Sequence, residues 1–430
     1  MKPDYDVIVM GGGPAGSCVS TLLAQQGRRV LVVEKERFPR HHIGESLIPE
    51  TYWPLKRMGV LDKIRQAGFT KKFSVQFASN DGRFSRPFYF FETNHHESAV
   101  TWQVLRSKFD ALMLDHARES GAEVRQGTLV QDVLFDGERA VGVEIREAGD
   151  GARGPVERLS AHVLVDATGL NALLSSRLGL RLRDPKLRKA VVYSYFRGAR
   201  RDPGVDHGAT LVLRTPPGSN GWFWFIPLAE DVTSVGIVAD PDYLFGGRGR
   251  DLEKIFAEEI ERCAAVRSRV EHATRVDRHY TIQDYSFRSR RCSGPGYVMI
   301  GDAYGFLDPI YSTGVFLALK SAELAADAIE RAFRAEDFSG ETLGAHEPRL
   351  RRGVESFRKL VYAYYASDFS FGNFIAEHPE CRANLIDLLV GNIFREGVDD
   401  IFEVMKDYCD IPPPLEFPPA PAAASSLAGK

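Results

Sequence analysis

The sequence predicts an α/β fold in which a parallel sheet is interrupted by an antiparallel sheet and followed by helices. A β-rich run at 6–10 leads through a glycine cluster into a helical pattern and then a second β-rich run at 30–33, as in a parallel βαβ unit. Later, four short β-rich runs separated by turns fill residues 190–240, which is typical of antiparallel strands. Residues 347–407 are helical in pattern and rich in aromatic side chains.

Composition narrows the function classes. The chain has 430 residues, a formal net charge of -3, 26% charged residues and 44% hydrophobic residues, which are ordinary globular values. The near-neutral charge argues against nucleic-acid binding. We find no signal region and no uncharged apolar stretch of about 18 residues, so no membrane span is expected. Five scattered cysteines without a CxxC pair predict no metal site and a reducing, cytoplasmic location.

The glycine cluster GGGPAG at 11–16 stands between the first strand and the first helix, where a dinucleotide-binding turn belongs. Gly11 permits the tight turn, Gly13 lets the backbone approach a pyrophosphate, and Gly16 allows close packing of helix on strand. Ala15 lies in the same turn. The helix that follows offers free N–H groups and the positive end of its dipole to phosphates.

An acidic residue, Glu34, ends the second strand 18 residues after Gly16. At this place a carboxylate accepts hydrogen bonds from the adenosine ribose hydroxyls. The pattern therefore predicts a dinucleotide site. The alternative is an ordinary glycine turn with a surface glutamate.

A second nucleotide-binding feature follows the buried strand predicted at 297–300, where Gly301 precedes Asp302. In this position Asp302 can bond the ribityl hydroxyls of FAD, while backbone N–H groups meet the pyrophosphate. Two features at separate strands favour FAD over NAD, because one extended cofactor then spans both. A simple strand-end turn is the alternative.

The loop after this strand leads into a strong helical pattern at 315–333. Its residues Ser312, Thr313 and Gly314 lie where free N–H groups favour negative charge, either that of a reduced flavin or a bound halide. A Ser/Thr cap at the start of a helix explains the same residues without a ligand.

The strand WFWFIP at 222–227 places two of the four tryptophans, Trp222 and Trp224, on the same side, because side chains alternate along a strand. The alternative is an aromatic strand within the core. Together with the other motifs, however, this segment resembles the flavin-dependent halogenases. The resemblance extends to about residue 410 and rests on GGGPAG at 11–16, FPRHHIGES at 38–46, the Lys71-Lys72 pair, WFWFIP at 222–227 and GDAYGFLDPIYSTGV at 301–315.

The resemblance implies a Rossmann-like FAD-binding domain of the aromatic hydroxylase/halogenase type, with an inserted antiparallel-sheet substrate domain and C-terminal helices. Arg106, before an amphipathic helix expected to start near Ser107, resembles a flavin-contacting arginine of the wider superfamily, although a surface cap is the alternative. The expected division is an FAD-binding domain at 1–75, 100–175 and 291–340, a substrate domain at 76–99 and 176–290, a helical region at 341–410 and a disordered tail at 411–430.

In that family, FADH2 from a separate NAD(P)H flavin reductase reacts with oxygen and halide to give hypohalous acid, which reaches a lysine beside the substrate. The resemblance implies that Lys72 is this lysine, with Lys71 as its neighbour on the opposite strand face. It places the halide at Ser312, Thr313 and Gly314, with Ser312 also catalytic. The strand residues Trp222, Trp224 and Pro227 would separate substrate from flavin.

Two departures refine this expectation. Family members that act on free tryptophan have a carboxylate where this chain has Tyr311, so a phenol or pyrrole is expected, free or bound to an acyl or peptidyl carrier protein. The family commonly has glycine where this chain has Ser74. The alternative functions are an isoprenoid or polyene reductase, an aromatic monooxygenase, or a flavin-binding scaffold without catalysis.

Overall fold

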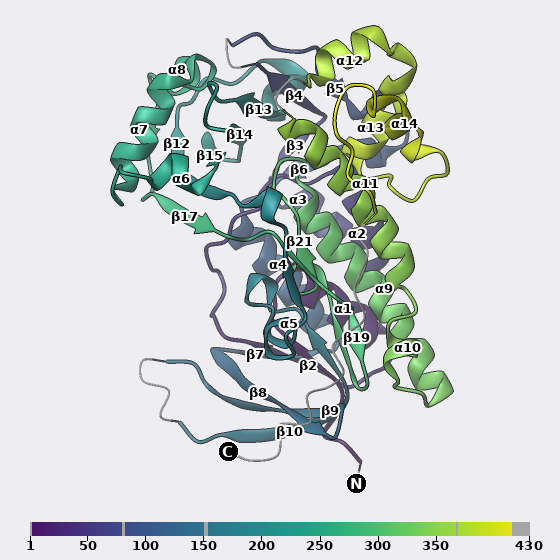
Figure 1. Cartoon of the computed structure of the whole chain (residues 1–430). Helices are drawn as coiled ribbons and strands as arrows, with labels where there is room; N and C mark the ends of the chain where they lie inside the picture. Colours follow the sequence, from purple (N-terminus) through teal and green to yellow (C-terminus); the bar gives the residue numbers. More distant parts are fainter. Residues whose placement is uncertain (1, 80–81, 150–153, 367–368, 415–430) are drawn as a thin grey trace.

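A computed structural model describes residues 2–79, 82–149, 154–366 and 369–414, and two large sheets organise it (Figure 1). The first sheet has the order β19-β20-β10-β1-β2-β7, and all its pairings are parallel except β19 with β20. The long hairpin β8–β9 extends it by pairing with the first half of β10. The strands are β1 (Tyr5–Met10), β2 (Val30–Glu34), β7 (Glu123–Gln126), β8 (Thr128–Asp136), β9 (Arg139–Glu147), β10 (Glu157–Asp166), β19 (Ser293–Gly294) and β20 (Tyr297–Met299).

Helices cover one face of this sheet. Three of them, α1 (Pro14–Gln25), α4 (Arg106–Glu119) and α9 (Thr313–Ala335), share a core with strand residues such as Val7 and Val32. Ile8 and Leu31 point to the other face, where β8 and β9 pack. Burial on both faces explains why these strands are continuously apolar in sequence. The α/β class predicted from the sequence is therefore confirmed.

The second sheet has the order β16-β12-β15-β14-β13-β4-β5, with β17 paired to β12. The four predicted runs form its centre as antiparallel neighbours. One expectation is wrong: β4 pairs with β13 in parallel, so the sheet is mixed. The strands are β4 (Ser74–Ala78), β5 (Phe88–Tyr89), β12 (Ala190–Arg197), β13 (Thr210–Arg214), β14 (Trp222–Pro227), β15 (Val232–Ala239), β16 (Thr274–Arg275) and β17 (Tyr280–Gln283).

The two faces of the second sheet have different covers. Helices α6 (Pro241–Phe245), α7 (Leu252–Arg262) and α8 (Ala264–Val270), which the sequence interpretation missed, bury the face that carries Phe223 and Phe225. The opposite face, with the tryptophans, packs against the C-terminal helices at the upper right of Figure 1. These are α11 (Glu347–Tyr365), α12 (Phe371–Glu377), α13 (Arg382–Val390) and α14 (Ile401–Met405).

Small sheets and short helices connect these parts. Strand β3 (Thr70–Lys72) pairs with β6 (Thr101–Gln103), and β18 (Phe287–Ser289) pairs with both β11 (Arg181–Arg183) and β21 (Gly305–Phe306). The remaining helices are α2 (Tyr52–Met58), α3 (Leu61–Gln66), α5 (Leu173–Arg177) and α10 (Gly340–Leu343). Across the described residues, every helix is too short or too polar to cross a membrane.

Three elements cross boundaries of the expected domain division. Strand β4 begins at Ser74 and crosses the boundary between residues 75 and 76, α5 crosses the one between 175 and 176, and α10 crosses the one between 340 and 341. The expected tail at 411–430 is ordered at its start, where the Pro413 carbonyl accepts a hydrogen bond from Arg358, and its residues 415–430 lie outside the described part. The division into domains stays a prediction.

Candidate functional site

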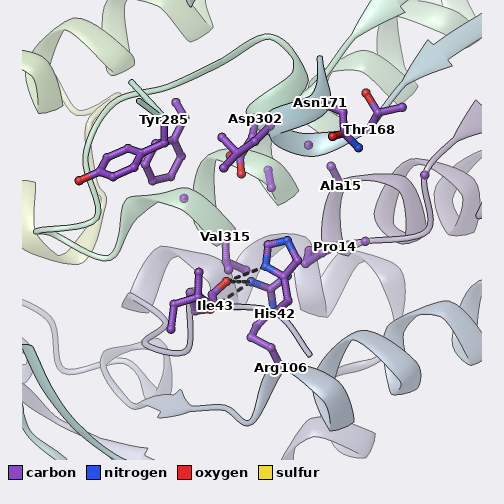
Figure 2. Close-up of a pocket in the computed structure, with 18 of the residues that line it drawn as sticks. Pro14, Ala15, His42, Ile43, Arg106, Thr168, Asn171, Tyr285, Asp302 and Val315 are labelled. Atoms are coloured by element: carbon purple, nitrogen blue, oxygen red, sulfur yellow. Dashed lines mark hydrogen bonds between the residues drawn. The ribbon is translucent and has the colours of Figure 1, made fainter. Parts of the chain in front are cut away.

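A cavity of about 530 Å³ reaches from the glycine turn and the end of β2 to the second sheet. One part of the cavity is lined by the glycine turn, Glu34, the segment at 40–46 and the start of α9. The other part is lined by Trp222 and Trp224. In Figure 2, Asp302 and Thr168 lie on one side of the pocket, and His42, Ile43 and Arg106 lie on the other. The nucleotide-binding features and the aromatic strand therefore belong to one site.

The glycine turn has the shape that a dinucleotide needs. Gly11 has a φ of +105°, and a Cβ there would lie 2.4 Å from the Ala167 carbonyl oxygen. A Cβ at Gly16 would lie 1.9 Å from the Gly11 carbonyl oxygen, so the close packing requires glycine at both places. At Gly13 a Cβ would approach only the Arg40 side chain, at 3.4 Å, and would otherwise point into the cavity. Gly13 and Ala15 both line the cavity, and their contact with a pyrophosphate stays a prediction.

Glu34 is buried at the cavity wall rather than on the surface. Its Oε2 accepts a 2.7 Å hydrogen bond from the Gly12 N–H, and its Oε1 accepts a 2.9 Å bond from the Glu36 N–H. These bonds fix the carboxylate beside the glycine turn. Each oxygen keeps a lone pair for a ribose hydroxyl.

Arg106 is also buried, with 4% of its surface exposed, so the surface-cap alternative is wrong. Its guanidinium pairs with Asp110 through bonds of 2.7 and 2.9 Å and donates a 2.5 Å bond to the Ile43 carbonyl. Asp302 lines the same cavity, where burial raises the pKa of its carboxyl to about 6 and Arg106 counteracts that rise. Gly301 does not line the cavity; its N–H donates to the Ser321 hydroxyl and holds the turn against α9.

The proposed halide loop reaches the cavity through two of its three residues. Ser312 has a φ of +58° directly before α9, and both Ser312 and Gly314 line the cavity. Thr313 is buried and does not line it. The long helix directs its unpaired N–H groups toward this point, which favours an anion.

The aromatic strand β14 presents Trp222 and Trp224 to the cavity, as predicted, with ring centroids 6.1 Å apart. Pro227 does not line the cavity, because alternation along the strand turns it to the opposite face. The Trp222 Nε1 donates to the Tyr365 hydroxyl (3.0 Å), which donates to Asp308 Oδ2 (2.9 Å). A hydrogen-bonded chain therefore joins the strand, α11 and the start of the halide loop.

Lys72 and Lys71 point to opposite sides of β3, with Lys71 exposed and Lys72 buried. The Lys72 Nζ donates to Ser46 Oγ (2.8 Å) and to the Leu47 carbonyl (3.0 Å). Ser46 lines the cavity, so the ammonium lies directly behind the cavity wall. Burial lowers the pKa of Lys72 to about 7. The Ser74 hydroxyl, two residues later, points to Asp206 at 3.4 Å.

Several cavity residues were not assigned a role from the sequence, among them Glu45, Ser46 and Thr210. The first two belong to the motif at 38–46, and the apolar run that begins at Leu47 was a signal that they are buried. Within the described ranges, no three His, Cys, Asp or Glu side chains are grouped to hold a metal ion. His41 stacks on Tyr280 at a centroid distance of 4.1 Å.

Comparison with known proteins identifies the family. The sequence model of the FAD binding domain matches residues 4–336. The chain is 33% identical to a 1H-pyrrole-2-carbonyl-[peptidyl-carrier protein] chlorinase of Pseudomonas fluorescens, an alignment that covers 94% of this chain and 93% of that protein. It is 32% identical to a corresponding brominase of Pseudoalteromonas luteoviolacea, with 91% and 92% covered.

Solved structures agree. The myxobacterial chondrochloren halogenase CndH, described as a variant of FAD-dependent halogenases, superposes with a TM-score of 0.79 at 32% identity, covering 89% of each chain. The flavin-dependent brominase Bmp2 superposes with a TM-score of 0.82 at 29% identity, covering 94% of this chain and 98% of its own. The glycine turn, Glu34, Arg106 and Asp302 provide a cavity that fits FAD, and the chain belongs to the flavin-dependent halogenases.

Proposed function

We propose that this enzyme halogenates a pyrrole or phenol that is bound to a carrier protein, with Lys72 directing the oxidised halogen to the substrate. The relatives that act on pyrrole-2-carbonyl groups of a peptidyl-carrier protein support this substrate class. The absence of a carboxylate at Tyr311 agrees with it. Tyr311 is buried, and its hydroxyl donates a 3.0 Å hydrogen bond to the Leu360 carbonyl, so this position offers no charge to a free amino acid.

The observation that carries the proposal is the position of Lys72 behind Ser46. When bound in its reduced form, the flavin would supply two electrons to oxygen, which together with two electrons from the halide would give hypohalous acid. The loop of Ser312 and Gly314 holds the halide by backbone N–H groups at the start of α9. Trp222 and Trp224 form an apolar wall that excludes the aromatic substrate from the cofactor part of the cavity.

The chemistry of Lys72 follows from its surroundings. A charged ammonium donates a hydrogen bond to the oxygen of hypohalous acid and makes its halogen more electrophilic. A neutral amine can accept the halogen directly. Because burial brings the pKa to about 7, both forms exist near neutral pH.

A separate NAD(P)H flavin reductase supplies FADH2 in this proposal, because one dinucleotide fingerprint is found in the sequence, at 11–16. The test combines the purified protein with FAD, a flavin reductase, NADH, oxygen and either chloride or bromide. Pyrrole-2-carbonyl on a peptidyl carrier, the same acid free in solution and a simple phenol are the substrates. Mass spectrometry should show halogenated carrier-bound pyrrole. Halogenation of the free substrates but not of the carrier-bound pyrrole would contradict the proposal that the substrate is carrier-bound. Reduction of the flavin by NADH without the reductase would contradict the proposal of a separate reductase.

A further inference from the structure

The wall of the cavity contains a carboxyl group, that of Glu45, to which the steps described above assign no role. Glu45 is 1% exposed and lines the cavity between the residues expected to bind FAD and the second sheet. Among the described residues, no group makes a well-formed hydrogen bond to either carboxyl oxygen, although the hydroxyls of Ser234 and Tyr195 lie near enough to influence the carboxyl. Burying an unpartnered polar group costs free energy, so such a group calls for a functional explanation.

The groups that face Glu45 come from three elements. Those that influence its carboxyl electrostatically or through a hydroxyl are Arg106 of α4, Tyr193 and Tyr195 of β12, and Ser234 of β15. Ser234 Oγ already accepts a 3.1 Å bond from Trp224 Nε1, so its own hydrogen is free to be donated. The hydroxyls and Arg106 favour the ionised carboxylate, but burial outweighs them and raises the pKa of Glu45 to about 7.

The other acids of the cavity are less suited to transfer a proton. Glu34 accepts two backbone N–H bonds, so both of its carboxyl oxygens already have protein partners. Burial raises the pKa of Asp302 to about 6 and Arg106 counteracts the rise, but its carboxyl is expected to bind the cofactor's ribityl hydroxyls. Glu36 is exposed and pairs with Arg40 at 3.3 Å. Glu45 is thus the buried acid in the lining whose proton is not committed to a protein partner.

Halide oxidation requires a proton. Written in full, FADH2 + O2 + X− + H+ gives FAD + HOX + H2O. Oxygen accepts two electrons from FADH2 and two from the halide, its O–O bond breaks, and an O–X bond forms. The second oxygen atom leaves as water and takes up the proton. The later step, HOX + ArH to ArX + H2O, consumes none.

We propose that Glu45 is the acid that delivers this proton inside the cavity. The inference rests on the halogenase function proposed above. After the transfer, the hydroxyls of Ser234 and Tyr195 and the charge of Arg106 stabilise the carboxylate until it is protonated again. Two neighbouring residues of the cavity wall then serve different steps. Glu45 acts when hypohalous acid forms, and Lys72, which lies behind Ser46, acts when the acid is used.

The first test uses the FAD-free protein. The variant Glu45→Gln keeps the size of the side chain but cannot release a proton, and Glu45→Asp keeps the acid. Glu50→Gln is the matched control, because Glu50 lies outside the cavity lining and accepts a 3.2 Å bond from Trp53. The infrared difference between the wild type and Glu45→Gln should contain the band of a protonated carboxyl that titrates near pH 7. A difference spectrum without this band would overturn the proposal.

The second test mixes each FADH2-loaded protein rapidly with oxygen and bromide, without aromatic substrate, and traps hypobromous acid. Glu45→Gln should form it about 100-fold more slowly, since a positioned general acid typically contributes at least that factor. FAD affinity should stay unchanged, Glu45→Asp should retain more activity, and the rate in the wild type should fall above pH 7. If Glu45→Gln forms hypobromous acid at the wild-type rate, the role of Glu45 is overturned but the proposed halogenase function is not. A wild-type protein that oxidises no halide would contradict the proposed function and this inference together.

Discussion

Lys72 donates a 2.8 Å hydrogen bond to Ser46, whose hydroxyl forms part of the cavity wall. The ammonium makes a second bond to the Leu47 carbonyl and lies 5.4 Å from the centroid of the Phe90 ring. It has no ion pair within the described part of the chain. Neutral oxygen acceptors alone hold this buried lysine, which explains why burial dominates its titration.

The titration of Lys72 should be visible in the pH dependence of stability. Its pKa is lowered from 10.5 to about 7 in the folded protein. Between these values the unfolded chain binds a proton at Lys72 that the folded chain does not, so the folded state gains stability as pH rises through this window. Lys72→Met should remove this gain, which is at most about 1.4 kcal/mol per pH unit. Denaturant unfolding at several pH values measures it.

The control for this experiment is Lys71→Met, because Lys71 is exposed on the other side of the same strand. Its stability should follow the wild-type pH profile. A profile of Lys72→Met that runs parallel to the wild type would contradict the shifted pKa.

Substitutions at Gly16 and Gly13 should have different effects, one on the stability of the fold and the other on FAD binding. Gly16→Val should destabilise the fold, because its Cβ would lie 1.9 Å from the Gly11 carbonyl oxygen. Gly13→Val should fold, because only the end of the Arg40 side chain is near, at 3.4 Å, yet it should lose FAD because the valine side chain would fill the cofactor's space. Thermal unfolding and FAD titration separate the two effects. A folded Gly13→Val with normal FAD affinity would place the pyrophosphate elsewhere.

The bond chain from Trp222 through Tyr365 to Asp308 should stabilise the aromatic wall. Tyr365→Phe leaves a buried indole N–H and a carboxylate oxygen unpaired, which should cost about 1–3 kcal/mol. Burial raises the pKa of Asp308 to about 6 and the Tyr365 hydroxyl lowers it, so its loss should raise the pKa further. The stability deficit should therefore be larger above pH 6 than below it.

Tyr364→Phe is the matched control, because its hydroxyl makes no well-formed hydrogen bond among the described residues and lies outside the bond chain from Trp222 to Asp308. Calorimetric unfolding at acidic and neutral pH gives both deficits. Equal melting temperatures for the two variants would show that the bond chain contributes nothing to stability.

The first sheet and its nucleotide turn could be predicted because their signals are local. The strand, the glycine turn, the helix and Glu34 occur within thirty residues, and each has a distinct chemical requirement. The alternation of Trp222 and Trp224 likewise follows from strand geometry alone. These features are confirmed in the positions that the sequence indicates.

Features that depend on distant contacts could not be predicted in this way. The parallel pairing of β4 with β13 joins segments more than 130 residues apart, and nothing in Ser74–Ala78 specifies the direction of its partner. Pro227 and Thr313 belong to motifs whose neighbours line the cavity, but the local backbone turns both away. The surroundings of Glu45 likewise come from distant parts of the chain, namely Arg106 of α4, Tyr195 of β12 and Ser234 of β15.

We expect Lys72 to use hypohalous acid that forms elsewhere in the cavity. The direct measurement compares halogenated aromatic product with trapped hypohalous acid in the wild type, Lys72→Ala and Lys71→Ala. Lys72→Ala should lose substrate halogenation by at least about 10–100-fold, the value of one charge-assisted hydrogen bond. It should still release hypohalous acid at the wild-type rate, and Lys71→Ala should match the wild type in both. Near-normal halogenation by Lys72→Ala, or an equal loss of trapped hypohalous acid, would show that Lys72 does not have this role.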